Sequence, residues 1–95
     1  ENLLGLNPFT STASSAVITV LEPSHGRASS DTVRFRNVSS FDGFTSTILE
    51  KAAGYSITKV NDDTYTFSAS SGTATTGEVR GGGGRVTAGP VTLGT

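Results

Sequence analysis

Three stretches of the chain place apolar residues at alternate positions, and a fourth is dense in β-branched residues. They cover residues 31–38, 54–60 and 63–70, and residues 15–21, respectively. In the first of them, Val33 and Phe35 are expected to face the core, because successive side chains of a strand point to opposite faces. The residues that alternate with them, Arg34 and Arg36, are expected to face solvent. These patterns predict four β-strands.

Turn residues separate these stretches. The sequence NDD at residues 61–63 joins two of them and predicts a β-hairpin. Pro23 ends the predicted strand over residues 15–21, because proline donates no hydrogen bond to a ladder. The sequence SHGRASSDTVRF at residues 24–35 is expected to reverse the chain twice, with Gly26 at positive φ and Ser30 or Asp31 in the second turn.

The last third of the chain carries weaker signals. Residues 73–80 predict an edge strand, and residues 85–93 predict a strand that Gly89 and Pro90 interrupt. The four glycines between them, residues 81–84, predict a flexible turn or a close approach of two backbones.

One short helix is expected in TILEKAAG, residues 47–54. Thr47 would be its N-cap, Glu50 would complete a capping box, and Gly54 would end it. Five or six strands at about ten-residue spacing, with this helical turn in the middle, predict an all-β fold, a small antiparallel β-barrel or sandwich. The expected organisation is an extended N-terminal arm over residues 1–10, a β domain over residues 11–88 and a C-terminal connector over residues 89–95.

Composition narrows the classes of function. The 95 residues include no cysteine, which excludes disulfides, thiol catalysis and cysteine-ligated metals. A net charge of −1 disfavours a specific nucleic-acid partner. No apolar run approaches the roughly 20 residues of a membrane span, so no membrane partner is expected. Because the sequence begins at Glu1 rather than at a methionine or a small residue, we expect it to be part of a longer protein.

Three residues near one turn invite a catalytic interpretation. Ser24, His25 and Asp31 are the residue types of a serine-hydrolase triad. Neighbouring residues on an extended chain point apart, and the chain has no G-x-S-x-G motif, so the turn is favoured over the catalytic site. The side chains of Asn61, Asp62 and Asp63 offer too few oxygens for calcium, and the glycines lack the lysine of a phosphate loop. We therefore expect no catalytic, metal-binding or cofactor-binding residue.

Contact surfaces are expected where apolar residues lie in irregular segments. Residues 1–9, ENLLGLNPF, show neither a helical nor a strand period, so this segment either contacts a neighbouring subunit or folds back on its own core. If it contacts a neighbour, deleting it should leave the domain folded. The loop from Phe41 to Phe44 offers aromatic anchors, and Arg34 and Arg36 offer a basic face. The candidate interface comprises Leu3, Leu4, Leu6, Phe9, Arg34, Arg36, Phe41 and Phe44.

The order of these motifs resembles a small β domain of bacteriophage virion proteins. Its family is described as similar to the first catalytic-cysteine half-domain of ubiquitin-activating enzyme. The resemblance spans residues 7–88 and rests on His25, Gly26, Asp31, Val33, Phe35, Tyr55, Ile57, Val60, Asp63, Thr64, Tyr65, Thr66 and Phe67. Ser30 stands where the family has glycine, and residues 41–54 are longer and more helical than its middle segment.

The resemblance implies a non-enzymatic structural protein of the virion, without a cofactor. It would bind many copies of tail or capsid subunits, including its own kind. Two alternatives stay open. A receptor-binding or capsid-decorating module would bind a host surface glycan through exposed aromatic rings, although the chain has no tryptophan and Tyr55 and Tyr65 are expected to face inward. A hydrolase built on His25 ranks below both.

Overall fold

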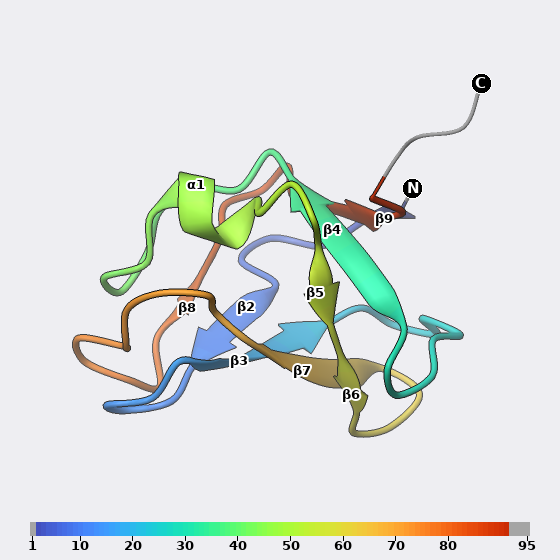
Figure 1. The fold of residues 1–95 in the computed structure, drawn as a ribbon, viewed down its shortest axis with the longest axis horizontal. Helices are drawn as coiled ribbons and strands as arrows, with labels where there is room; N and C mark the ends of the chain where they lie inside the picture. Colours follow the sequence, from blue (N-terminus) through green and yellow to red (C-terminus); the bar gives the residue numbers. More distant parts are fainter. Residues whose placement is uncertain (1, 92–95) are drawn as a thin grey trace.

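The computed structural model describes residues 2–91, and in these the chain forms two antiparallel β-sheets (Figure 1). The four-stranded sheet has the order β1 (Asn2–Leu3), β9 (Thr87–Gly89), β4 (Thr32–Arg36) and β5 (Tyr55–Ser56). The five-stranded sheet has the order β6 (Thr58–Lys59), β7 (Thr64–Ser68), β3 (Val17–Leu21), β2 (Phe9–Ser11) and β8 (Arg80–Gly81). The expected all-β fold is confirmed, and its form is a sandwich.

The core lies between the two sheets. Val33 and Phe35 of β4 are fully buried, as their alternation with the arginines predicts. They face the inward residues of the other sheet, and the Phe35 ring lies 5.0 Å from the ring of Phe67 on β7. The fully buried side chains are mostly large and apolar, namely Tyr65, Phe9, Phe35, Phe44, Ile18, Leu49, Ile57, Val20, Val33 and Val86.

The N-terminal segment belongs to the sandwich and is not an extended arm. β1 pairs with β9, and the backbone N–H of Leu4 donates to the carbonyl of Val86. β2 pairs with β3, which places Phe9 opposite Val20 in the core. The expected boundary after residue 10 falls inside β2, so of the two alternatives the segment folds back on its own core. The expected connector also begins inside a strand, β9, and its residues 92–95 lie outside the described part of the chain.

The expected hairpin forms only in part. β6 pairs with β7, and the Asn61 side chain accepts hydrogen bonds from the backbone N–H groups of Asp63 and Thr64, as a polar turn requires. The predicted strand before this turn is split, however, because β5 belongs to the four-stranded sheet and β6 to the five-stranded sheet (Figure 1). Its first half, β5, pairs with β4. This split and the strands of the N-terminal segment explain why the described residues hold more strands than the five or six expected.

The helix α1 covers Ser46–Leu49 and begins earlier than expected. Thr45, not Thr47, is the N-cap, and its hydroxyl accepts a hydrogen bond from the Ile48 N–H at 3.3 Å. Glu50 closes no capping box, because its carboxylate accepts from the backbone N–H of Val38 at 3.2 Å.

The predicted edge strand over residues 73–80 reduces to Arg80 of β8 and an isolated bridge at Ala74. The backbone N–H groups of Thr76 and Gly77 donate to the carboxylate of Asp42, at 2.8 and 2.9 Å, so they are not available to a strand ladder. A side chain from the Phe41–Phe44 segment therefore holds the middle of the loop. Its last residues, Glu78 and Val79, exchange backbone hydrogen bonds with Ser11 of β2.

A close approach does occur among the glycines, but at Gly81 the neighbour is a side chain and not a second backbone. A Cβ atom there would lie 2.4 Å from the Phe41 ring, whereas a Cβ on Gly5 would meet nothing within 4 Å. We expect Gly81→Ala to lower the free energy of unfolding by about 1–3 kcal/mol, because the ring must move out of its packed position. Gly5→Ala is the matched control and should change it by less than about 0.5 kcal/mol in the same urea titration. Equal effects of the two substitutions would contradict this packing.

Candidate functional site

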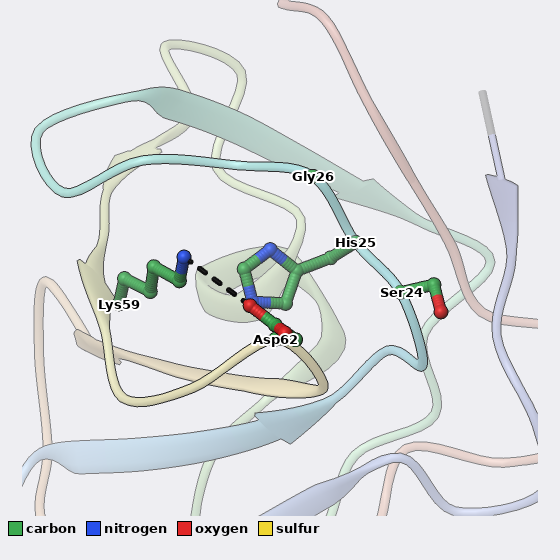
Figure 2. Close-up of a pocket in the computed structure, with 5 residues that line it drawn as sticks. All are labelled: Ser24, His25, Gly26, Lys59 and Asp62. Atoms are coloured by element: carbon green, nitrogen blue, oxygen red, sulfur yellow. Dashed lines mark ion pairs between the residues drawn. The ribbon is translucent and has the colours of Figure 1, made fainter.

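A surface hollow of about 260 Å³ lies beside the turn that holds the chain's single histidine (Figure 2). It is lined by Ser24, His25, Gly26, Lys59 and Asp62. Ser24 and Gly26 have positive φ angles of 53° and 64°, which confirms the expected chain reversal and the role of the glycine. The Lys59 ammonium pairs with the Asp62 carboxylate at 3.4 Å, so the charges of the rim offset each other.

Both ring nitrogens of His25 are hydrogen-bonded to backbone groups, one in its own turn and one in the turn after β6. The backbone N–H of Arg27 donates to Nδ1 at 2.8 Å, so Nδ1 is unprotonated and Nε2 carries the hydrogen that it donates to the Asn61 carbonyl at 2.7 Å. The ring also packs edge-on against Tyr65, with 5.1 Å between the centroids. His25 thus ties the turn to the hairpin that follows β6.

The three residue types of a catalytic triad do not come together. Figure 2 shows the Ser24 side chain pointing away from the His25 ring. The Asp31 carboxylate accepts a hydrogen bond from the Ala28 N–H at 2.9 Å, within the second chain reversal. Ser30, at φ 76°, adopts in that reversal the conformation that favours glycine.

We expect His25→Ala to lower the free energy of unfolding by about 1–3 kcal/mol. The substitution leaves the Arg27 N–H and the Asn61 carbonyl without their partner in a part-buried place. Lys59→Ala is the control, because it removes only the exposed ion pair at the same hollow and should cost less than about 1 kcal/mol. A His25 variant as stable as the wild type in urea would show that the ring does not hold the turn.

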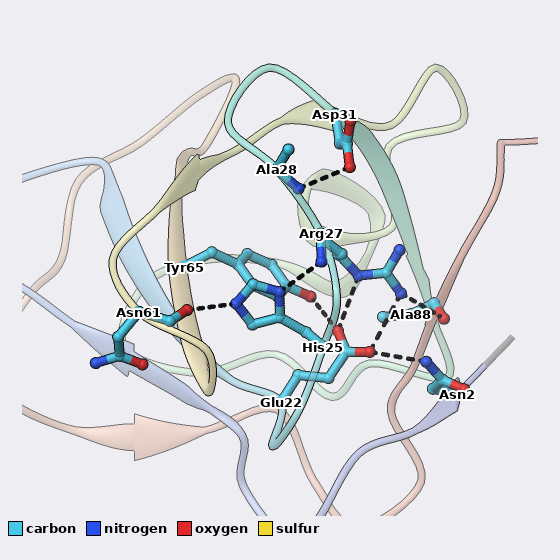
Figure 3. A network of polar contacts seen from close by, with 9 residues as sticks. All are labelled: Asn2, Glu22, His25, Arg27, Ala28, Asp31, Asn61, Tyr65 and Ala88. Atoms are coloured by element: carbon cyan, nitrogen blue, oxygen red, sulfur yellow. Dashed lines mark hydrogen bonds and ion pairs between the residues drawn. The ribbon is translucent and has the colours of Figure 1, made fainter.

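A buried ion pair next to the histidine is the main polar feature of the interior (Figure 3). The Glu22 side chain is 3% exposed, and its carboxylate accepts hydrogen bonds from the Arg27 guanidinium at 3.1 and 3.2 Å. The Tyr65 hydroxyl donates to it at 2.7 Å and the Asn2 amide at 3.0 Å. Arg27 also donates to the Ala88 carbonyl at 3.3 Å. The network therefore joins β1 and β9 of one sheet to β3 and β7 of the other.

The electrostatics of this network keep Glu22 ionised and the Tyr65 hydroxyl protonated, the states in which they hydrogen-bond to each other. Burial raises the pKa of Glu22, but the hydrogen bonds from Arg27, Tyr65 and Asn2 outweigh it, and the pKa lies below its ordinary value of 4.5. Burial and the Glu22 carboxylate raise the pKa of Tyr65 well above its ordinary value. Sequence reasoning missed this network, because Glu22 looked like the residue that ends a strand before Pro23.

The candidate interface residues divide into exposed and buried groups. Leu4, Phe9 and Phe44 are 4%, 0% and 1% exposed, so they are core residues and the expectation that they face a partner is corrected. Leu3 and Leu6 are each 70% exposed and remain available for contacts. The buried residues face inward because the segments that carry them pair with β3, with β9 or across the Phe41–Phe44 loop.

The other three candidates are half-buried. The Phe41 ring stacks on the Phe9 ring, with 6.1 Å between the centroids. Arg34 and Arg36 lie on the outer side of β4, where Arg36 donates to the carbonyls of Pro90 and Val91 at 2.9 Å each. The expected basic stripe is therefore partly used to fasten Pro90 and Val91 to the same sheet.

The outer side of the five-stranded sheet is a second exposed surface, which the sequence patterns did not predict. It carries threonines in its centre and aliphatic residues around them, and we call it the threonine face. It consists of Thr58, Thr64, Thr66, Thr19, Thr10, Val17, Leu21 and Val60. The alternation in TYTFS, residues 64–68, signals its threonines, but only the strand pairing shows that they line up.

Residues 2–91 contain neither a candidate metal site nor a candidate membrane-spanning helix. No group of three or more histidine, cysteine, aspartate or glutamate residues in this range is placed to hold a metal ion. Within the same range, no helix is both long and apolar enough to cross a membrane.

The fold and the site define a small antiparallel β-sandwich whose two sheets are clamped by a buried polar network. No family model matches the sequence, and no curated protein matches it. Among solved structures, the chain is similar to part of Phage phi92 endosialidase, with a TM-score of 0.65 and 19% identity over 92% of this chain and 12% of that chain. The chain thus spans a small part of that protein's length, and the likeness shows a shared fold.

The comparison bears on the family that the motifs resemble. A fold that also occurs in a phage protein agrees with the phage part of the resemblance. The likeness to the half-domain of ubiquitin-activating enzyme is not supported, because no family model matches.

Proposed function

We propose that this chain is a non-enzymatic structural domain of a bacteriophage virion that mediates contacts between subunits in the tail. The observation that carries the proposal is the shared fold over 92% of this chain with a part that makes up 12% of a phage endosialidase. A module of this size can recur as one unit of longer chains, where its work is to position its neighbours.

The polar groups of the interior support a structural role. His25 spends both nitrogens on backbone groups, and Glu22 accepts hydrogen bonds from three side chains. An enzyme's base needs a free nitrogen or oxygen within reach of a substrate, whereas these groups are already hydrogen-bonded within the domain. The result is a domain in which these polar side chains are bonded to one another or to the backbone, with exposed apolar side chains, such as Leu3 and Leu6, on its surface.

The tail is the proposed location because of what the similar protein is named for. The similar protein is by its name a phage endosialidase, a glycan-cleaving enzyme, and the proposal places the shared fold in the tail on the strength of that name. The test is mass spectrometry of gradient-purified particles of a phage that encodes this sequence. Peptides of the chain in a constant ratio to known tail proteins are expected, and their absence from the particles would overturn the proposal.

A glycan-binding module is the second candidate, favoured by the same name. Exposed aromatic platforms, however, are not found among residues 2–91. Both tyrosines are at most 5% exposed, and the phenylalanines are buried or half-buried. A glycan array probed with the purified domain tests this candidate, and a clean negative would remove it.

A further inference from the structure

We propose that the threonine face is a self-association surface that binds the same face of a second copy of this chain. This contact would supply the partner for the structural role proposed above, and the proposal rests on that role. The face has three aligned rows of side chains, and each of them follows from the strand register.

The central row crosses four strands. Thr58 of β6 lies opposite Thr66 of β7, which lies opposite Thr19 of β3, which in turn lies opposite Thr10 of β2. Residues directly opposite each other in a sheet share a face. Their chain neighbours, such as Ile18 and Phe67, are buried in the core, so the threonines point outward.

Aliphatic residues flank this row on both sides. On one side Leu21 is paired with Thr64, and the Val60 N–H donates to the Thr64 carbonyl, so the three residues form a second row. On the other side Val17 is paired with Ser68. Leu21, Val60 and Val17 are 44%, 58% and 37% exposed, although each is an aliphatic residue.

Charge is missing from the middle of the face. The charged residue in register with the central row is Arg80, opposite Thr10 on the edge strand β8, and its guanidinium donates to the carbonyls of Leu6 and Asn7. Along a strand with one solvent-exposed face, buried apolar residues usually alternate with polar or charged residues that point to solvent. The centres of protein interfaces, by contrast, are depleted of charged residues. The composition of this face is that of an interface centre.

A second copy fits this face better than a charged partner does. A threonine hydroxyl both donates and accepts a hydrogen bond, so a row of threonines is complementary to the same row of another copy. A twofold arrangement would bring identical rows together and bury the flanking aliphatic residues. The outer side of the other sheet carries Arg34 and Arg36, and a twofold contact there would bring like charges together.

The size of the face sets the strength of the contact. The five strands hold 2, 5, 5, 3 and 2 residues. At about 3.4 Å per residue and about 4.8 Å between strands, they give a face of roughly 280 Å² per copy. Stable dimers bury about 800 Å² per partner, so the isolated domain should associate weakly, with a dissociation constant on the order of 0.1–1 mM. In a particle, many copies held close together would make such a contact effective.

The test is a concentration series of the purified chain, from about 0.05 to 2 mM, followed by sedimentation equilibrium and by amide chemical shifts. We expect a monomer–dimer equilibrium and shifts confined to β2, β3, β6 and β7. Thr19→Lys should weaken the association at least about tenfold, because it would bring two positive charges together near the twofold axis. The control Ser56→Lys places the same charge on an exposed position of the other sheet and should leave the association unchanged.

A monomer over the whole range would overturn the proposal, as would shifts that map to β1 or to the outer side of β4. If Thr19→Lys fails to fold, Leu21→Lys takes its place, because that side chain is 44% exposed. A folded Thr19→Lys or Leu21→Lys variant that associates as strongly as the wild type would also overturn the proposal. The experiment needs no virion, so a negative result leaves the mass-spectrometric test of the proposed function unaffected. A negative mass-spectrometric result would likewise leave the self-association measurement unaffected.

Discussion

Replacing Phe9 by alanine is expected to lower the free energy of unfolding by about 3–5 kcal/mol, the cost of truncating a buried aromatic ring. Phe9 is 0% exposed, and its ring centroid lies 5.0 Å from that of Phe35 and 5.9 Å from that of Phe67. It therefore joins the two sheets at the centre of the core. Domains of this size are stable by about 5–15 kcal/mol in total, so much of the fold's stability would be lost.

Urea denaturation followed by circular dichroism measures this loss, and Leu3→Ala is the control. Leu3 comes from the same N-terminal segment but is 70% exposed, so its truncation should change the stability by less than about 0.5 kcal/mol. Deleting residues 1–9 should likewise unfold the domain, because it removes β1 and Phe9. A small effect of Phe9→Ala, similar to that of Leu3→Ala, would mean that the segment is a detachable arm.

Replacing Glu22 by glutamine is expected to cost about 2–4 kcal/mol at pH 7. The amide cannot balance the charge of Arg27, whose side chain is 18% exposed, and its NH₂ group would face the guanidinium donors. Asp62→Asn is the matched control, the same exchange of carboxylate for amide in an exposed ion pair, and should cost less than about 0.5 kcal/mol. Equal costs would show that the buried pair does not stabilise the fold.

The pH dependence of this pair follows from the lowered pKa of Glu22 in the fold. A carboxyl group whose pKa is lower in the folded state contributes its stability above its unfolded pKa, which is about 4.5. The contribution is lost as the pH falls below that value and through the lower folded pKa. The stability difference between the wild type and Glu22→Gln should therefore be constant from pH 7 to about 5 and shrink in more acidic solution. A difference that stays constant into strong acid would contradict this assignment.

Local patterns predicted the features that depend on neighbouring residues. The alternation around Val33 and Phe35 indicates their burial, which the structure confirms. The turn from Pro23 to Gly26 is also confirmed, because turn residues act over only a few positions. The expectation that His25 belongs to a turn is confirmed by the φ angles of Ser24 and Gly26 and by the bonds of His25 to Arg27 and Asn61.

Features that depend on distant strands were missed or misplaced. The burial of Leu4 depends on Val86, and that of Phe9 depends on Val20 and on the opposite sheet. No periodicity within residues 1–9 encodes those partners. The partners of Glu22 lie as far away as Tyr65, and the threonine face exists only when the register of four strands is known.

Labelling the domain in assembled particles tests the central claim, that this chain is a structural part of a phage tail, most directly. A small epitope inserted beside Gly5, an exposed position with nothing within 4 Å of an added Cβ, is detected with gold-labelled antibody by electron microscopy of purified phage. We expect gold at the tail of nearly every particle, in similar number from one particle to the next. Gold on the head, or particles without label although the tagged protein is produced and folded in the infected cell, would contradict the account.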